Sequence, residues 1–250
     1  MTFSPQINVL NQDHISDIHS KSLHILEKAG IRVDCEDALE IFKRSTYVKT
    51  EGKLVYIMPE LVEKSIASAP SSIKIYNKQG EEAFVIGNTG SSKARFGVGV
   101  TNSNFQDPVT GKIVQFRREH TRYATKLGDM LESYDMISTP GVPMDVPPQK
   151  LDLFNLADMY ANTDKPLVIL LLADGIMAKA MEFIKLIHGD PGSRPFIMPY
   201  VNPVTPLILN KSTTDKMKVS IENGLPLIFS NYGMSGGTSP IDGAGTLTLL

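Results

Sequence analysis

The chain has one cysteine and no tryptophan among its 250 residues, and it has almost no excess of either charge. A single cysteine, Cys35, cannot form an internal disulfide or supply a thiolate cluster for zinc or an iron–sulfur centre. The 25 Lys and Arg residues nearly balance the 27 Asp and Glu residues, and no basic cluster offers a surface for nucleic acid. These absences exclude nucleic-acid binding and favour a reducing cytoplasm.

Long apolar runs are also lacking. The longest, PLVILLLA at residues 166–173, is far shorter than the roughly 20 residues that a helix needs to cross a bilayer. The N-terminus has no positively charged stretch followed by an apolar run, so it does not predict a secretory signal. The sequence therefore predicts a cytoplasmic protein without a membrane segment, in which residues 166–173 form a strand that is buried on both faces.

Residues 1–88 predict a small lead-in domain of mixed α and β structure. Apolar residues recur at helical spacing between Ile15 and Ala29, and Gly30 follows where a helix end takes a left-handed residue. The other features expected here are a helix capped by Asp34, a helix that begins at Pro59, and short strands at 73–76 and 83–86.

From about residue 89 onward, apolar β runs alternate with helical segments. Three of the runs each follow a proline, at Pro166, Pro195 and Pro226, and two earlier runs have the sequences ARFGVGV and DMISTPGV. Strands that alternate with helices at this spacing predict a parallel sheet with right-handed crossovers. The helices are expected at residues 118–134, 149–162, 176–188 and 212–223, the last with Ser212 as its cap and Gly224 at its end.

Two α/β architectures fit this pattern, an open doubly wound sheet and a (β/α)8 barrel of the TIM type. The dinucleotide-binding form of the open sheet requires G-x-G-x-x-G, but Asn102 follows Gly97 and Gly99 in place of the last glycine. The D-P-V-T-G sequence beyond it predicts a hairpin turn rather than a helix start. We therefore predict that residues 89–250 form the first part of a (β/α)8 barrel, incomplete with about five βα units, in the front portion of a longer protein.

Side chains for acid–base or nucleophilic catalysis are scarce at the expected strand ends. Asp145 and Asp174 are the carboxylates there. Ser235 fits the G-x-S-x-G spacing of a hydrolase elbow, but the expected helix starts later and no histidine is placed to help it. The first three histidines are spaced so that they turn away from one another around a helix, and His120 and His188 are expected in helices away from the catalytic side. The sequence predicts no metal site and leaves the catalytic residues unknown.

Glycines, amides, hydroxyls and aromatic rings dominate the expected strand ends instead. The glycine-rich stretch at 233–238 can cradle an anion with its backbone N–H groups, but it lacks the lysine of a phosphate-binding loop, and a flexible turn explains it equally well. Three aromatic residues, Phe96, Tyr200 and Tyr232, can surround a quaternary ammonium group or fill the core. Both alternatives stay open on the sequence alone.

Five segments, in order along nearly the whole chain, resemble the trimethylamine methyltransferase family. They are LHILEKAGIRVDCEDALEIF, MPELVEKSIASAPSSIKIYN, FGVGVTNSNFQDPVTGKI, DVPPQKLDLFNLADMYANTDKPLV and MSGGTSPIDGAGTLTL. The resemblance implies a (β/α)8 barrel that follows an N-terminal segment in a chain longer than this one. Trimethylamine-specific members use pyrrolysine in a region that would lie beyond Leu250, so the resemblance leaves open which amine is the substrate.

The resemblance also implies a chemistry. A methyl group would pass from a quaternary or tertiary amine, such as glycine betaine or trimethylamine, to the Co(I) corrinoid (cobalamin) of a separate corrinoid-binding protein, in one-carbon metabolism or methanogenesis. No cofactor would be bound directly, because the corrinoid is presented by the partner. A quaternary ammonium group leaves as a neutral amine without a general acid, so the chain would need only to hold, desolvate and aim it.

We predict a set of substrate-binding residues on these grounds. The aromatic residues are expected to contact the methylammonium group, the asparagines to make polar contacts, and the glycine-rich backbone to bind a carboxylate. The set is Phe96, Asn102, Tyr200, Asn202, Asn231, Tyr232, Gly233, Ser235, Gly236, Gly237 and Thr238. The alternatives are a phosphate-binding, aldolase-like barrel enzyme and an inactive truncated fragment whose open sheet edges favour association, including as a homo-oligomer.

Overall fold

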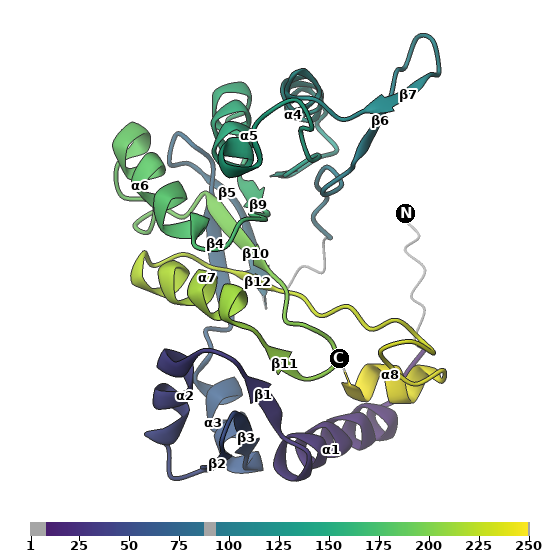
Figure 1. Ribbon diagram of the computed structural model, residues 1–250, viewed down its shortest axis with the longest axis vertical. Coiled ribbons are helices and arrows are strands. Elements are labelled where there is room, and N and C mark those ends of the chain that lie inside the picture. The colour runs from purple at the N-terminus through teal and green to yellow at the C-terminus, as the bar shows by residue number, and fades with distance from the viewer. Residues whose placement is uncertain (1–8, 88–93, 250) are drawn as a thin grey trace, which may run out of the picture. The chain divides into compact units, whose positions relative to one another are not determined.

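The computed structural model describes residues 9–87 and 94–249, which divide into two compact units (Figure 1). The N-terminal unit contains the chain up to Ala69 together with residues 202–211 and 231–250. The sheet unit contains residues 70–201 and 212–230. The boundary predicted between residues 88 and 89 lies outside the described residues.

A four-stranded mixed sheet organises the N-terminal unit, with strand order β11-β1-β3-β2. β1 runs antiparallel to β3 and parallel to β11. Val33, Leu39 and Val55 form its small core. The elements are α1 (Gln12–Lys28), β1 (Ile31–Val33), α2 (Glu36–Lys43), β2 (Val48–Glu51), β3 (Leu54–Ile57), α3 (Pro59–Ser68), β11 (Ile208–Leu209) and α8 (Gly243–Leu249).

Two of the predicted helix boundaries in this unit are confirmed and one is wrong. Gly30 follows α1 with φ +70°, and a Cβ there would lie 2.7 Å from the Val55 carbonyl oxygen, so glycine is required. Pro59 is the first residue of α3. Asp34, however, does not cap α2, which begins at Glu36 after Cys35. The Asp34 carboxylate accepts hydrogen bonds from the side chains of Arg32 and Lys53 instead.

A parallel sheet organises the sheet unit, as predicted. Its strand order, β12-β10-β9-β8, follows the chain without the reversal that a doubly wound sheet makes. Helices follow the strands and cover one face, where α5, α6 and α7 lie along β9, β10 and β12 (Figure 1). The elements are α4 (Arg118–Met130), β8 (Ile137–Ser138), α5 (Pro148–Asn162), β9 (Leu167–Ile169), α6 (Ile176–His188), β10 (Ile197–Val201), α7 (Lys211–Glu222) and β12 (Ile228–Phe229).

Three local predictions in this unit need correction. The ARFGVGV segment is not a regular strand, because it pairs with the sheet through a parallel bridge at Gly97 and then bends at Thr101, which has φ 51°. α4 ends at Met130 rather than at residue 134, because the backbone of Leu131 is already extended, with ψ 112°, and Lys165 donates to the carbonyls of Gly128 and Leu131 there. Ser212 lies inside α7 and is not its cap, because the helix begins one residue earlier.

Two hairpins complete the sheet unit. β6 (Asn104–Gln106) and β7 (Ile113–Gln115) flank the D-P-V-T-G turn, as predicted. β4 (Ser72–Tyr76) and β5 (Glu82–Gly87) form the second hairpin, which packs on the sheet face opposite the helices.

The two faces of the parallel sheet bury different apolar clusters. The helix-side cluster includes Ile137, Leu167 and Ile197 together with residues of α5 and α6. The interior cluster joins Val168 and Met198 to the β4–β5 hairpin, and its other members and neighbours are Ile75, Phe84, Met136, Tyr200 and Ile228. The side chains of alternate residues in each strand therefore point to opposite faces of the sheet. The interior face is apolar below the carboxyl ends of the strands.

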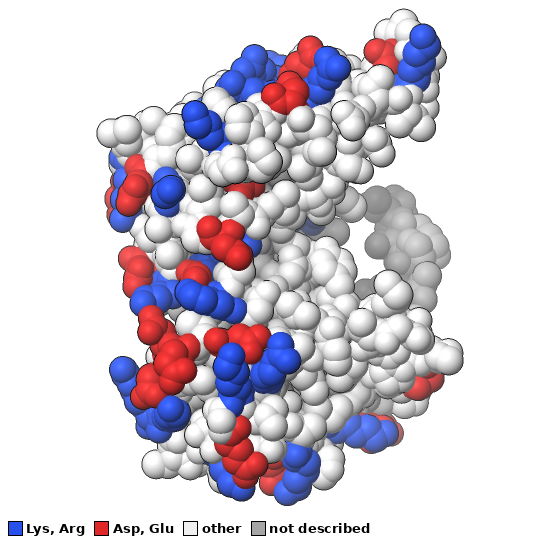
Figure 2. Space-filling model, viewed as in Figure 1, with Lys and Arg blue, Asp and Glu red and all other residues white. Residues whose placement is uncertain are grey.

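The surface charges agree with the balanced composition. Figure 2 shows Lys and Arg interspersed with Asp and Glu on the face that it displays, without a patch of only positive or only negative residues. Within the described residues, no helix combines the length and the apolar character that crossing a membrane requires.

Candidate functional site

The carboxyl ends of the parallel strands form the candidate site. We call this region the strand mouth and define it as residues 101–102, 139–141, 170–173, 200–201 and 229–230. The β4–β5 hairpin occupies the opposite end, because the Tyr76 amide donates to the Pro195 carbonyl and the Lys78 amide to the Asp164 carbonyl, both just before strands. A ligand on the interior face of the sheet would therefore enter at the strand mouth, the usual side in such folds.

Thr101 and Asn102 join the strand mouth through hydrogen bonds to the segment after β8. The Thr101 amide donates to the Thr139 carbonyl at 3.0 Å, and both the amide and the side-chain Nδ2 of Asn102 donate to the Pro140 carbonyl at 3.2 and 2.9 Å. Thr101 has φ 51°. A β-branched residue in this left-handed region costs about 1–3 kcal/mol, so the surrounding bonds must enforce it.

Gly141 continues this segment and is tightly enclosed. A Cβ at Gly141 would lie 2.5 Å from the ring of Phe116, which is buried. Its carbonyl accepts a hydrogen bond from Nδ2 of the buried Asn155, whose Oδ1 accepts the Thr121 hydroxyl. Buried polar side chains that are fully partnered fix one arrangement of their neighbours. Helices α4 and α5 thus hold this part of the strand mouth in place.

The segment after β9 is held by a second polar group. Asp152 of α5 is 3% exposed, and its carboxylate accepts the amides of Leu172 and Ala173 at 2.8–3.0 Å. Nζ of Lys216 donates to the Leu171 carbonyl at 2.7 Å. Burial lowers the pKa of Lys216, while the charges of Asp152 and Asp174 act in the opposite direction. We call Asp152, Lys216 and the backbone of residues 171–173 the mouth clamp.

Tyr200 lies on the interior face of the sheet near the end of β10. Ile197 packs into the helix-side cluster, whereas Met198 and Tyr200 pack with the interior cluster. The ring is partly buried, so it can form one wall of a ligand site above the apolar interior. The sequence left two possibilities for this ring: it contacts a quaternary ammonium group, or it fills the core. Both agree with this position.

Phe96 and Val98 are two residues apart, so in an extended segment their side chains point to the same side, and Val98 packs against the helix-side cluster. Gly97 points to the other side, because a Cβ there would meet Met136 and Ser138. Phe96 therefore lies on the Val98 side of this segment, away from the side that Gly97 presents to Met136. Phe96 is 60% exposed, and its backbone pairs with Asp135.

The glycine-rich stretch belongs to the N-terminal unit and is a compact loop. The amides of Gly237 and Thr238 donate to the Met234 carbonyl, and the Gly236 amide donates to the Ser239 carbonyl. These three amides are thus used within the loop, contrary to the expectation that the glycines leave their N–H groups free for a carboxylate. The Ser235 hydroxyl donates to the carbonyls of residues 240 and 241, and the helix α8 begins only at residue 243, so the structure does not form a hydrolase elbow.

The predicted substrate-binding residues are divided between the two units. Phe96, Asn102 and Tyr200 belong to the sheet unit, and the rest of the set belongs to the N-terminal unit. In the latter, Asn231 accepts the Thr205 hydroxyl at 2.6 Å, and Tyr232 is 61% exposed. That the whole set contacts one substrate stays a prediction.

The histidines and carboxylates do not assemble into a metal-binding group in the described part of the chain, where no three His, Cys, Asp or Glu residues are placed to hold an ion. His120 corrects an expectation, because it lies in the first turn of α4 and therefore near the carboxyl ends of the strands. Its ring stacks on Phe105 with centroids 4.0 Å apart, and its Nδ1 accepts the Arg117 amide. Packing and helix capping account for His120.

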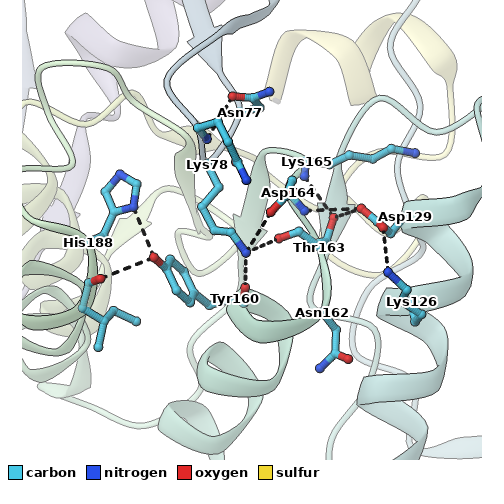
Figure 3. Close-up of polar contacts among 12 residues, drawn as sticks. Asn77, Lys78, Lys126, Asp129, Tyr160, Asn162, Thr163, Asp164, Lys165 and His188 are labelled. Atoms are coloured by element: carbon cyan, nitrogen blue, oxygen red, sulfur yellow. Dashed lines mark hydrogen bonds and ion pairs between the residues drawn. The ribbon is translucent and has the colours of Figure 1, made fainter.

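The polar cluster in Figure 3 lies at the other end of the strands. Nζ of Lys78 donates to the carbonyls of Tyr160 and Thr163 at the end of α5 and pairs with Asp164 at 3.0 Å. The Tyr160 hydroxyl lies 3.3 Å from Nδ1 of His188. These groups bind helix ends to the β4–β5 hairpin and so hold together the end of the sheet opposite the strand mouth.

His188 makes the stability of this cluster depend on pH. Burial, with a contribution from the Lys78 charge, lowers the pKa of His188 below its ordinary value of 6.5. The unfolded chain therefore binds the proton first as pH falls, so the free energy of unfolding should decline from pH 7 through pH 6 and below. Replacing His188 with Gln should flatten this decline in urea titrations. His24→Gln, a change at an exposed helix position, is the control, and equal pH slopes for wild type and His188→Gln would contradict the prediction.

Sequence reasoning missed Asp152, Lys216 and Thr101. Asp152 and Lys216 carried no signal, since each is a polar residue inside an expected helix. A signal existed for Thr101, because it lies between Gly99 and Asn102 at the end of an expected strand. The relevant contacts are made with segments far away in the sequence, so residue pattern alone does not reveal them.

The chain matches one protein family over almost its whole length. Residues 2–250 match the family model described as trimethylamine methyltransferase (MTTB). A trimethylamine methyltransferase MttB of Desulfitobacterium hafniense (strain DSM 10664 / DCB-2) is 27% identical over 241 residues, which are 95% of this chain and 48% of that protein. The glycine betaine methyltransferase of Desulfitobacterium hafniense (strain Y51) is 27% identical over 253 residues, covering 98% of this chain and 51% of that protein.

A protein of another organism is also similar to this chain. The trimethylamine methyltransferase MttB of Methanosarcina barkeri is 26% identical over 253 residues, which cover 97% of this chain and 50% of that relative. The chain spans about half the length of the curated relatives that it matches.

Proposed function

Because the chain belongs to the trimethylamine methyltransferase family, we propose that it binds a methylated ammonium compound at the strand mouth and takes part in transfer of one of its methyl groups. The observation that carries this proposal is the position of Tyr200, a part-buried aromatic ring on the interior face at a strand end. Relatives bear the names of trimethylamine and glycine betaine methyltransferases, and these two amines define the substrate class that we propose.

We further propose that the parallel sheet is part of a (β/α)8 barrel. Strands that neighbour one another in chain order, with helices on one face, support this. The remaining βα units would correspond to the part of the relatives that this chain does not match.

The proposed methyl acceptor is the corrinoid of a separate partner protein, which supplies a cobalt nucleophile when it is bound. The described residues of the strand mouth fit an acceptor brought from outside, because they are apolar, aromatic, hydroxyl or amide groups without a thiol or an imidazole. The chain would bind the cation, exclude water and point one methyl group outward. The nitrogen of a quaternary ammonium group keeps the electron pair of the broken bond and leaves as a neutral tertiary amine, so the chain need not donate a proton.

Calorimetric titration with glycine betaine tests the proposal. Tyr200→Ala should weaken binding about tenfold, a change of ~1.4 kcal/mol, which lies within the range of a desolvated cation–π contact. Tyr200→Phe keeps the ring face and should bind as wild type does. The carbon isostere 3,3-dimethylbutanoate has the same shape without the positive charge, so it should bind more weakly to wild type than glycine betaine.

Two outcomes would count against the proposal. If neither glycine betaine nor trimethylamine binds to the chain or raises its melting temperature, the proposed function is wrong. If Tyr200→Ala binds glycine betaine as wild type does, the proposed contact between the Tyr200 ring and the ammonium group is wrong even though the ligand binds.

A further inference from the structure

Thr101 is a strained residue at the strand mouth that the predicted substrate-binding set omits. Its φ of 51° lies in the left-handed region that β-branched residues avoid. In the sheet unit it is, among described residues, the one non-glycine residue with positive φ, since Leu207 belongs to the other unit. Strain of this kind persists where the surrounding structure enforces it, and it is concentrated at ligand-binding positions.

The surrounding hydrogen bonds explain how the conformation is maintained. On one side of the strained φ, the Thr101 amide donates to the Thr139 carbonyl at 3.0 Å. On the other side, Asn102 is bridged to Gly141, and its carbonyl accepts the Val142 amide at 2.9 Å. Gly141 is itself held by Phe116 and Asn155. The chain around Thr101 is thus fixed before any ligand arrives, which is the condition for a preorganised contact.

The hydroxyl of Thr101 is the part of the residue that this arrangement leaves available. It makes no hydrogen bond to another residue in the described part of the chain, and the side chain is half-buried. Its neighbours are already engaged, because the Thr139 hydroxyl accepts the Leu170 amide and the Asn102 side-chain amide donates to Pro140. A half-buried hydroxyl donor without a partner suits an anionic oxygen, which forms stronger hydrogen bonds than a neutral one.

We propose that Thr101 is a specificity-determining residue whose hydroxyl donates to the carboxylate of a betaine bound at the strand mouth. The inference rests on the proposed function and deepens it, because it selects a methylated ammonium compound that carries a carboxylate over one that lacks it. The strained backbone at Thr101 holds the donor in place, so the ligand need not order it on binding.

The matched variants Thr101→Val and Thr101→Ser test the hydroxyl. Valine keeps the β-branched shape and loses the donor, whereas serine keeps the donor and loses the branch. In calorimetry, Thr101→Val should bind glycine betaine about tenfold more weakly than wild type, while Thr101→Ser should stay within about twofold. The affinity for tetramethylammonium, which has no carboxylate, should be the same in wild type and Thr101→Val.

Thr101→Gly tests the strain separately, because glycine adopts positive φ without penalty. Its melting temperature should equal or exceed that of wild type, and a lower one would overturn the strain argument.

If wild type binds glycine betaine and Thr101→Val binds it equally well, the role of the hydroxyl is overturned while the proposed function stands. If wild type binds tetramethylammonium but not glycine betaine, the carboxylate preference is overturned. If wild type binds neither of these ligands nor trimethylamine, the proposed function fails as well.

Discussion

Replacement of Asp152 with alanine is expected to lower the free energy of unfolding by about 3 kcal/mol, the largest loss that we predict for a single polar side chain in this protein. The Asp152 carboxylate is buried and accepts the amides of Leu172 and Ala173. Hydrogen bonds to a charged group contribute about 1.5–3 kcal/mol, and the two amides would be left without this acceptor. Lys216 would also lose the charge of Asp152, which opposes the lowering of the Lys216 pKa by burial.

Urea unfolding at pH 7 measures this effect. Asp152→Asn should lose less stability than Asp152→Ala, because Oδ2 of Asp152 already accepts both amides and an amide oxygen in its place can still do so, without the charge. Asp174→Ala is the matched control, since Asp174 is an exposed carboxylate that also faces Lys216. Its loss should stay within roughly 0.5 kcal/mol, as for most exposed charges. If Asp152→Ala unfolds with the same midpoint as Asp174→Ala, the mouth clamp does not stabilise the fold.

The mouth clamp also contains a contact that the sequence could not predict, although the sheet that it stabilises could be predicted. The alternation of proline-led apolar runs with helices correctly predicted the parallel sheet, because burial on both faces and the helix period are properties of neighbouring residues. Asp152, in contrast, lies in the helical segment PQKLDLFNLADMYAN as one polar residue among several. Its function depends on how α5 packs against residues 171–173, and no local pattern encodes that contact.

The strand mouth illustrates the same limit in backbone conformation. ARFGVGV predicted a strand, yet the backbone turns into the left-handed region at Thr101, directly after that segment, where the Thr101 amide pairs with the Thr139 carbonyl. The glycine-rich loop illustrates a different case. Its composition left a turn and an anion-binding loop equally open, because composition cannot show that the amides of Gly236, Gly237 and Thr238 already have acceptors inside the loop. Site predictions from residue type alone therefore need the hydrogen-bond partners before they can name a donor.

Lys78 supports the opposite end of the same sheet, and its replacement with methionine is expected to lower the free energy of unfolding by about 2–3 kcal/mol. The side chain of Lys78 is 18% exposed, and its ammonium group binds two backbone carbonyls at the end of α5 as well as Asp164. Methionine keeps the apolar stem and removes the charge. The carbonyls then lose a charged donor at the negative end of the helix dipole.

Lys74→Met is the matched control, because Lys74 lies in the same hairpin and forms an ion pair with Glu82 in which both side chains are largely in solvent. Such a pair contributes about 0–1 kcal/mol, so the two lysines should differ clearly in thermal unfolding, by roughly 2–4 °C for each kcal/mol in a chain of this size. Equal melting temperatures for Lys74→Met and Lys78→Met would show that the ammonium group of Lys78 is not what secures the hairpin.

Two further measurements on Lys78→Met separate stability from function. The Lys78 charge helps to lower the pKa of His188, so in Lys78→Met an NMR titration should find that pKa nearer to its ordinary 6.5 than in wild type. Binding of glycine betaine, measured below the unfolding transition, should stay unchanged, because Lys78 lies at the amino ends of the strands and the proposed site lies at their carboxyl ends. A loss of affinity in the folded variant would mean that the ligand reaches through the sheet interior to the hairpin, and the strand mouth would then not be the whole site.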